Sequence, residues 1–176
     1  FAMKDILENI YYGISLMTGR IKIGDYIVCD GIRGRVSSIS YTSTMLEALD
    51  GSVIAFQNSQ LFTKNYKNMT KNHGYELDIL EVGIAYGSNI NEVKKMLVDA
   101  ITALGITYTE KSVQVMIKSF DDSCVTLKVL VWVNVFTQGS DDSAIMECIY
   151  ETLEKNGIEI PFPQREITIK HQTIEE

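Results

Sequence analysis

The sequence has few of the residue types that usually build catalytic or metal sites. It contains only three cysteines and two histidines among 176 residues. Cys29, Cys124 and Cys148 lie far apart, and an odd number without Cys-x-x-Cys spacing predicts buried, reduced thiols rather than disulfides or a zinc site. His73 and His171 have no Cys or His at metal-ligand spacing and are interpreted as solvated surface residues. We therefore expect no catalytic residues, no metal and no cofactor.

Positive charge is also scarce. The formal net charge is −7, and no run of five or more basic residues occurs. The strand-like segments lack aromatic residues interleaved with Lys or Arg, so we expect no nucleic-acid partner. The carboxylate pairs Asp121-Asp122 and Asp141-Asp142 fit a turn and the first turn of a helix, where acidic side chains are stabilising.

Long apolar runs are absent as well. The longest, from Val125 to Phe136, is interrupted by Lys128 and Asn134, and no segment reaches the ~18 apolar residues that a membrane-spanning helix needs. The chain begins at Phe1 inside a helical pattern and shows no signal peptide. We expect it to be a piece of a longer protein, so a membrane region upstream stays open.

What the sequence does contain starts with helical periodicity over residues 3–18. Apolar residues recur there at three- and four-residue steps, namely Met3, Leu7, Ile10, Ile14 and Met17. An amphipathic helix of this kind either lies at a membrane surface or partner interface, or covers a protein core. The pattern alone leaves both interpretations open.

From residue 21 to about residue 68 the pattern changes to short strands with frequent turns. Asp30-Gly31 and Asp50-Gly51 are typical of tight turns. Strands are expected at residues 25–29, 34–41, 42–49, 52–57 and 63–67. Five short strands without a helix predict a small β-barrel.

From residue 75 onward strands and helices alternate. Asn89 and Glu92 form a capping box that predicts the start of a helix. Strands are expected at residues 75–85, 112–120, 124–136 and 167–169, and a second helix at 141–155. From Val125 to Val135 the odd-numbered residues are apolar, which predicts one buried strand face. The order β-α-β-β-α-β predicts a ferredoxin-like α+β domain with both helices on one face of the sheet.

The polar segment 69–74 separates these two modules. We therefore expect a helix over residues 1–20, a barrel over 21–68 and an α+β domain over 75–176, with separate cores. Both prolines, Pro161 and Pro163, come just before the last expected strand and hold the chain extended there.

Four short motifs follow one another in a recognisable order. Gly24-Asp25 comes after the helix, Asp50-Gly51 and Asn58-Ser59 lie in the barrel segment, and Pro161-Phe-Pro-Gln164 follows the last helix. Together with the helix, this order resembles the cytoplasmic C-terminal portion of the small-conductance mechanosensitive channel (MscS-like) family. The resemblance implies that the barrel is Sm-like and that these motifs belong to the family pattern.

The same resemblance implies roles for residues near the start of the chain. Asn9 and Gly13 match a recurring Asn and Gly in the distal end of the family's pore-lining helix, where they would take part in gating. Gly24 and Asp25 would form the junction between this helix and the barrel.

For the whole protein, the resemblance implies an ion channel rather than an enzyme. Such a channel opens under membrane tension and releases ions and small solutes in osmotic downshock. It would be a homo-heptamer in the inner membrane, attached through upstream transmembrane helices, with this portion on the cytoplasmic side. The alternative is a stand-alone oligomeric binding or scaffold module that uses the same Sm-like and ferredoxin-like folds.

The sequence also departs from the family pattern. Gln57 stands where the family commonly has Pro, Leu46-Glu47 where it has Arg, and Gly19-Arg20-Ile21 where it has Arg-Pro. Lys4-Asp5 replaces the Gln-Gly at which the pore helix of well-known members bends. The bending mechanism is therefore not carried over to this chain.

Overall fold

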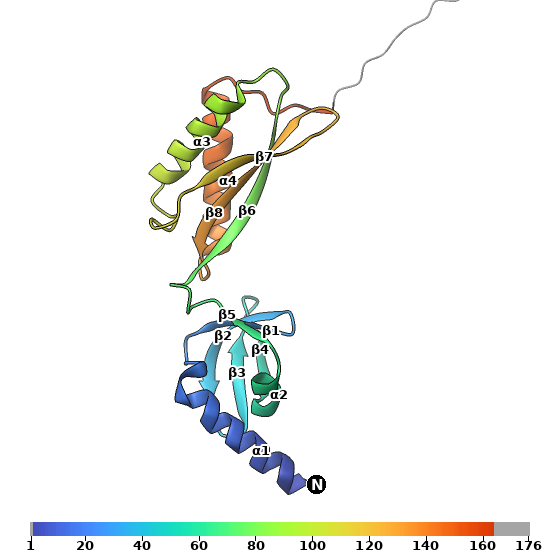
Figure 1. Cartoon of the computed structure of the whole chain (residues 1–176), viewed down its shortest axis with the longest axis vertical. Coiled ribbons are helices and arrows are strands. Elements are labelled where there is room, and N and C mark those ends of the chain that lie inside the picture. Colours follow the sequence, from blue (N-terminus) through green and yellow to red (C-terminus); the bar gives the residue numbers. More distant parts are fainter. Residues whose placement is uncertain (1, 164–176) are drawn as a thin grey trace, which may run out of the picture. The chain divides into compact units, whose positions relative to one another are not determined.

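The computed structural model describes residues 2–163 of the chain (Figure 1). Contacts group the chain into two compact units. The first contains the residues up to Glu76 together with Val133–Gln138, and the second contains Leu77–Trp132 and the residues from Gly139 onward. The strand expected at residues 167–169, Gln164 and His171 lie outside the described residues. The domain boundaries expected from the sequence stay predictions.

The first unit begins with helix α1 (Ala2–Ser15), which continues into a π-helical turn, η1 (Leu16–Arg20). Five strands follow, interrupted by the short helix α2 (Asn58–Thr63). The strands are β1 (Tyr26–Cys29), β2 (Ile32–Ile39), β3 (Ser43–Glu47), β4 (Val53–Gln57) and β5 (Tyr66–Asn68). They form one sheet in the order β4-β3-β2-β1-β5, in which every pairing is antiparallel.

The core of the first unit lies between this sheet and the two helices. A register shift between Val36 and Ser38 interrupts the β2–β3 ladder, and such bulges let a sheet bend. Helix α1 runs along the sheet beside α2 (Figure 1). The buried hydrophobic cluster there consists of Leu16, Ile21, Ile27, Cys29, Val36, Leu46, Phe56 and Leu61.

Two sequence predictions for this unit are wrong. The barrel segment was expected to contain no helix, yet residues 58–63 form α2, and β5 starts at Tyr66 rather than residue 63. A helix of six residues is too short to show periodicity; only its buried residues, Asn58 and Leu61, are spaced three apart. The N-terminal helix expected over residues 3–18 is present: it is α-helical to Ser15 and continues as a π-helical turn to Arg20.

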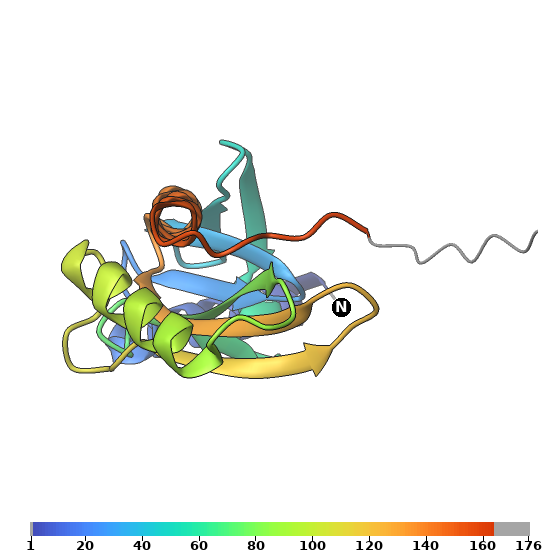
Figure 2. The same cartoon turned by 90° about the horizontal axis from the view of Figure 1, so that it is seen from above.

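The second unit alternates strands and helices as predicted. Its elements are α3 (Ile90–Ala103), β7 (Gln114–Phe120) and most of β6 (Tyr75–Ile84), β8 (Val125–Asn134) and α4 (Gln138–Lys155), since the first two residues of β6, the last two of β8 and the first of α4 group with the first unit. The sheet order is β6-β8-β7, with β7 and β8 antiparallel. Seen from above, α4 is viewed end-on while α3 runs obliquely across the view (Figure 2). The mixed fold with an N-terminal helix and two sheets is thus confirmed, and β-α-β-β-α of the ferredoxin-like order falls within residues 2–163.

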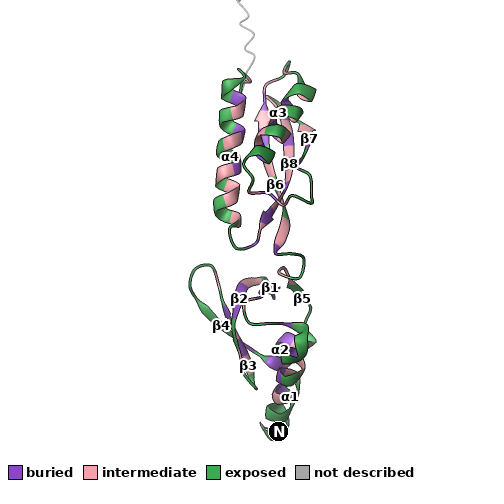
Figure 3. Cartoon of the chain, turned by 90° about the vertical axis from the view of Figure 1, so that its left-hand side faces the viewer, coloured by how far each residue is buried: buried purple, intermediate pink, exposed green. Residues whose placement is uncertain are grey.

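Alternation along β8 builds the core of the second unit. Its odd-numbered residues from Val125 to Val133 are buried and the even-numbered ones are half-buried, which confirms the predicted face. Helix α4 places Ile145, Ile149 and Leu153 inward, and its exposed residues lie on the side away from the strands (Figure 3). Val93, Leu97 and Ile101 are the buried residues of α3.

Local signals at the ends of these helices also act as expected. The Asn89 side chain accepts a hydrogen bond from the Glu92 backbone N–H, which confirms the N-cap. Gly105 and Gly157 follow α3 and α4 with φ of 69° and 67°, the left-handed conformation that ends a helix. Of the three cysteines, all free thiols, only Cys29 is fully buried; Cys124 and Cys148 are half-buried, so the prediction of burial is wrong for these two.

Candidate functional site at the helix–barrel junction

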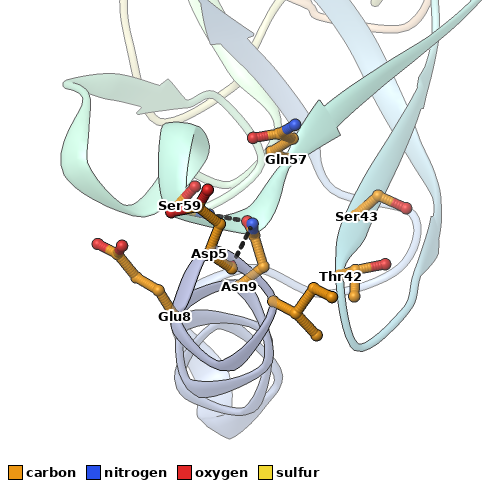
Figure 4. Close-up of a pocket in the computed structure, with 8 residues that line it drawn as sticks. Asp5, Glu8, Asn9, Thr42, Ser43, Gln57 and Ser59 are labelled. Atoms are coloured by element: carbon orange, nitrogen blue, oxygen red, sulfur yellow. Dashed lines mark hydrogen bonds between the residues drawn. The ribbon is translucent and has the colours of Figure 1, made fainter. Parts of the chain in front are cut away.

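Asn9 connects α1 to the start of α2. It is the one buried polar residue among the described side chains of α1, with 9% of its surface exposed. Its side-chain Oδ1 accepts a hydrogen bond from the Ser59 backbone N–H at 2.9 Å, and its Nδ2 donates to the Asp5 carbonyl at 2.9 Å (Figure 4). Both the oxygen and the nitrogen of the Asn9 amide are therefore hydrogen-bonded, and the oxygen links α1 to α2.

Asn58 is the central residue of the junction and is completely buried. Its Nδ2 donates to the Ser40 carbonyl at 2.9 Å and, at 3.5 Å, to the carbonyl of Asn9. Its Oδ1 accepts a hydrogen bond from Thr44 Oγ1 at 2.9 Å, and its backbone N–H donates to Thr42. One side chain thus ties α1 to the β2–β3 turn and to β3.

Gly13 lets the helix approach this cluster closely. A Cβ built on Gly13 would lie 2.5 Å from both the Tyr41 carbonyl oxygen and Asn58 Nδ2, well inside van der Waals contact. Any larger residue must therefore push the helix or the β2–β3 turn away. The structure brings together Asn9, Gly13 and Asn58, which the sequence had singled out in separate segments.

Thr44, Ser59 and Ser40 complete the junction; the Asn58-Ser59 motif had included Ser59, but none of the three had been predicted to have a role in the site. Thr44 is fully buried in β3, and a polar residue at an inward strand position is the signal that could have identified it. Ser59 and Ser40 contribute backbone groups, for which a side-chain pattern gives no signal.

Gly24 and Asp25 form a second polar cluster, just after the helix. Gly24 has φ of 93°, and its N–H donates to the Val36 carbonyl at 2.8 Å. The Asp25 carboxylate accepts hydrogen bonds from the Lys22 N–H at 3.0 Å and from Asn68 Nδ2 at 2.7 Å. This buried carboxylate fixes the turn through which the helix enters the sheet.

Asp50 and Gly51 form the β3–β4 turn. The Asp50 carboxylate accepts from the Ser52 hydroxyl at 2.6 Å and the Ser52 N–H at 2.9 Å, and these bonds hold the pKa of Asp50 below its usual value. Gly51 has φ of 82°, which a residue with a side chain rarely adopts. Both residues shape the hairpin between β3 and β4.

Pro161 and Pro163 lie in the second unit. The chain approaching them is held by a backbone hydrogen bond from Ala85 N–H to the Glu159 carbonyl at 2.9 Å. Pro161 lines an apolar cavity of about 510 Å³ together with Tyr150, Ile158, Ile160 and Phe162. The prolines are thus part of an apolar surface rather than of a polar site.

A cavity lined mostly by polar residues adjoins the junction. Beside Asn9 lies a cavity of about 400 Å³ lined by Asp5, Glu8, Ser43, Gln57 and Ser59, with no nucleophile–base pair among them (Figure 4). Within residues 2–163 no three His, Cys, Asp or Glu side chains gather as metal ligands. Burial raises the pKa of the Cys29 thiol, and the neighbouring Asp30 charge raises it further.

Helix α1 does not turn its apolar stripe toward the protein. Its buried residues are Asn9 and Gly13, followed by Leu16 at the start of η1, whereas the apolar stripe predicted from the sequence is largely exposed. Met3 is 75% exposed, Leu7 60% and Ile14 51%. Of the two interpretations left open by periodicity, the core-covering one does not fit this stripe in the single chain. No helix in the described part of the chain is long and apolar enough to span a membrane.

Comparison with known proteins gives the same picture for both units. Residues 5–71 match the family model "Mechanosensitive ion channel, beta-domain", and residues 78–160 match "Mechanosensitive ion channel MscS, C-terminal". An MscS family protein from Archaeoglobus fulgidus is 30% identical over 94% of this chain and 58% of its own length. The small-conductance mechanosensitive channel of Helicobacter pylori is 29% identical over 97% of this chain and 63% of its own.

Solved structures agree. The closed-state structure of Helicobacter pylori MscS matches with a TM-score of 0.82 and 29% identity, covering 97% of this chain and 68% of that one. Arabidopsis thaliana MSL1 matches at 15% identity with a TM-score of 0.73, a likeness of fold alone.

A helix hydrogen-bonded to a β-domain and followed by this α/β domain defines the C-terminal portion of a mechanosensitive ion channel. The chain belongs to the small-conductance mechanosensitive channel (MscS) family. This is a family of membrane channels and not a class of enzymes. The chain spans about 58% of the length of the first curated relatives it matches.

Proposed function

We propose that this chain is the vestibule portion, on the cytoplasmic side of the inner membrane, of a channel that opens under membrane tension and releases ions and small solutes in osmotic downshock. Helix α1 is the distal end of the pore-lining helix, and Asn9 and Gly13 are its gating residues. The proposal keeps the expected domains: the helix over residues 1–20, the Sm-like barrel over 21–68 and the ferredoxin-like domain over 75–176.

One observation carries the proposal, namely the two faces of α1. The inward face is joined to the barrel by the bond from the Ser59 N–H to Asn9 Oδ1 and by the close approach at Gly13. The outward face exposes Met3, Leu7 and Ile14. A surface helix of a monomeric soluble protein packs such an apolar stripe against the core. Tyr11 adds an exposed residue of a type favoured at membrane interfaces.

This arrangement suits a mechanical coupling. Tension shifts the balance between closed and open states only if the two states differ in interaction energy. A helix that faces membrane or neighbouring helices on one side, and is hydrogen-bonded to a rigid sheet on the other, transmits such a difference. Gly13 and the Asn9–Ser59 bond are the contacts that must change when the helix repacks.

Self-assembly into a homo-heptamer, with membrane attachment through upstream helices, is part of the proposal. A closed ring is the usual outcome when head-to-tail contacts complete a rotation. Exposed apolar residues on α1 supply a surface for such contacts. Light scattering of the full-length protein checks this point, and a strict monomer would contradict it.

Patch recording of the full-length protein, in a strain lacking other such channels, tests the function. We expect tension-gated currents in the parent and an altered tension threshold in Gly13→Leu, because the added side chain meets Tyr41 and Asn58. Gly139→Leu is a matched control, since a Cβ at Gly139 meets nothing within 4 Å. Currents that do not depend on membrane tension would favour the scaffold alternative. So would a coding sequence without apolar spans of ~20 residues upstream of this chain.

A further inference from the structure

The end of the proposed gating helix has an unusual geometry. After Ser15 the chain makes a π-helical turn over Leu16–Arg20, closed by a 3.5 Å backbone bond from Ile21 N–H to the Leu16 carbonyl. Gly19 interrupts it with φ of 117°. The last carbonyls of a helix have no partner within the helix itself, and they carry its partial negative charge.

Lys71 binds these carbonyls from a distant part of the sequence. Its Nζ donates to the Arg20 carbonyl at 2.7 Å and to the Gly19 carbonyl at 3.3 Å. Lys71 comes three residues after β5, at the point where the chain leaves the sheet of the first unit. A lysine ammonium at a helix C-terminus is favourable both as a hydrogen-bond donor and as a charge.

The backbone that carries Lys71 is itself fixed to the turn after the helix. Its N–H donates to Asn68 Oδ1 at 3.2 Å, and Asn68 Nδ2 donates in turn to the Asp25 carboxylate. The next residue toward the N-terminus, Thr70, accepts a hydrogen bond from the Tyr26 N–H at 2.6 Å. The ammonium therefore extends from an anchored segment, and its two bonds reach the carbonyls of Gly19 and Arg20 at the end of the helix.

We propose that Lys71 is a positioning residue for gating, which holds the end of the pore helix in the closed arrangement. The inference rests on the proposed function, and the closed arrangement is assigned because the chain resembles Helicobacter pylori MscS in its closed state. If the helix repacks on opening, the π-turn moves relative to Lys71, so the two bonds contribute to the closed state alone.

The gating test uses three variants of the full-length channel. Lys71→Gln removes the charge, Lys71→Arg keeps it, and Lys67→Gln removes a matched exposed charge on β5. We expect Lys71→Gln to lower the tension threshold, which corresponds to a shift of about two- to five-fold per subunit in the closed–open equilibrium. Lys71→Arg and Lys67→Gln should gate near the parent threshold, and single-channel conductance should be equal in all four proteins.

A second readout separates this inference from the proposed function. Amide hydrogen exchange of the full-length protein should be faster at residues 16–22 in Lys71→Gln than in Lys71→Arg, and equal at residues 43–57. That result together with a lowered threshold supports the inference. Faster exchange with an unchanged or raised threshold, or equal shifts in Lys71→Gln and Lys71→Arg, overturns it. A parent channel without tension-gated currents contradicts the proposed function instead, and unaltered exchange at residues 16–22 contradicts the Lys71 contact by itself.

Discussion

The two units bury different kinds of side chain. In the second, β8 and helices α3 and α4 contribute Val, Leu and Ile almost exclusively, and Thr107 is the one buried polar residue within the described residues of that unit. The first buries four polar residues, Asn9, Asp25, Thr44 and Asn58. Apolar burial is strong but non-directional, whereas a buried hydrogen-bonded amide fixes its partners in one geometry. The second unit is thus built for stability and the first for holding a helix in place.

The largest effect is expected from a charge in the apolar core. Val129 is completely buried in β8, opposite Val115 of β7. Val129→Asp should destabilise the second unit by more than about 4 kcal/mol, because an unpaired carboxylate loses its hydration there. Thermal unfolding and amide exchange of both units would measure it.

A matched change on the other strand face provides the control. Lys128 pairs with Met116 and is only half-buried, so Lys128→Asp should change stability by about 1 kcal/mol or less. Similar losses in the two variants would mean that the strand register is wrong. A loss of exchange protection in the first unit as well would mean that the two cores are not independent.

The apolar unit is also the one that the sequence predicted well. Its signals are local: period-two alternation from Val125 to Val135, the Asn89 cap and glycines after the helices. In the first unit, the conformation depends on tertiary contacts. The π-turn at Leu16–Arg20 and the six-residue α2 have no periodic signature.

The site was only half predictable for the same reason. Motif resemblance identified Asn9, Gly13 and Asn58, but pattern alone could not show that they meet. Periodicity identified the apolar stripe that includes Leu7 and Ile14 but left open whether it faces a core or another environment, whereas burial follows hydrogen bonds and the small residue at the contact. A helix that serves two environments has two faces, and hydrophobicity marks only one of them.

A methyl group at Gly13 is the next largest perturbation. Gly13→Ala places Cβ 2.5 Å from the Tyr41 carbonyl oxygen, a backbone atom that moves only with the β2–β3 turn. We expect a loss of about 2 to 3 kcal/mol in the first unit despite the better helix propensity of alanine. Gly139→Ala in α4, where space is open, should be neutral or slightly stabilising. Equal changes in stability for the two variants would show that the close approach at Gly13 is not important for the junction.

Loss of one buried hydrogen bond should cost less. Thr44→Val keeps the shape of the side chain but leaves Asn58 Oδ1 without the donor that lies at 2.9 Å. We expect a destabilisation of about 1 to 2 kcal/mol, confined to the first unit, whereas Thr44→Ser retains the donor and should recover part of the loss. Chemical denaturation of the three proteins measures it, and a Thr44→Val protein as stable as the parent would show that this bond does not hold the junction.

The smallest expected effects are losses of stability at acidic pH. They arise at two turns, one in each unit, where an aspartate accepts hydrogen bonds from neighbouring residues. Hydrogen bonds from Ser52 hold the pKa of Asp50 below its usual value, and bonds from Thr126 and then Ser119 do the same for the pKa of Asp121. Because the folded-state pKa lies below the unfolded one, each stabilisation is complete above the ordinary aspartate pKa and is lost as the pH falls through the folded-state pKa.

The two turns therefore form a matched pair for titration. Ser52→Ala removes the hydroxyl that contributes most at the first turn, so the pKa of Asp50 should rise toward its ordinary value while that of Asp121 stays low. Thr126→Val should do the reverse, since its hydroxyl contributes most at the second turn. Carboxyl-carbon NMR titration follows both groups in one sample. If the pKa values of both aspartates change in either variant, the two units are electrostatically coupled. The two units would then be less independent than their separate cores suggest.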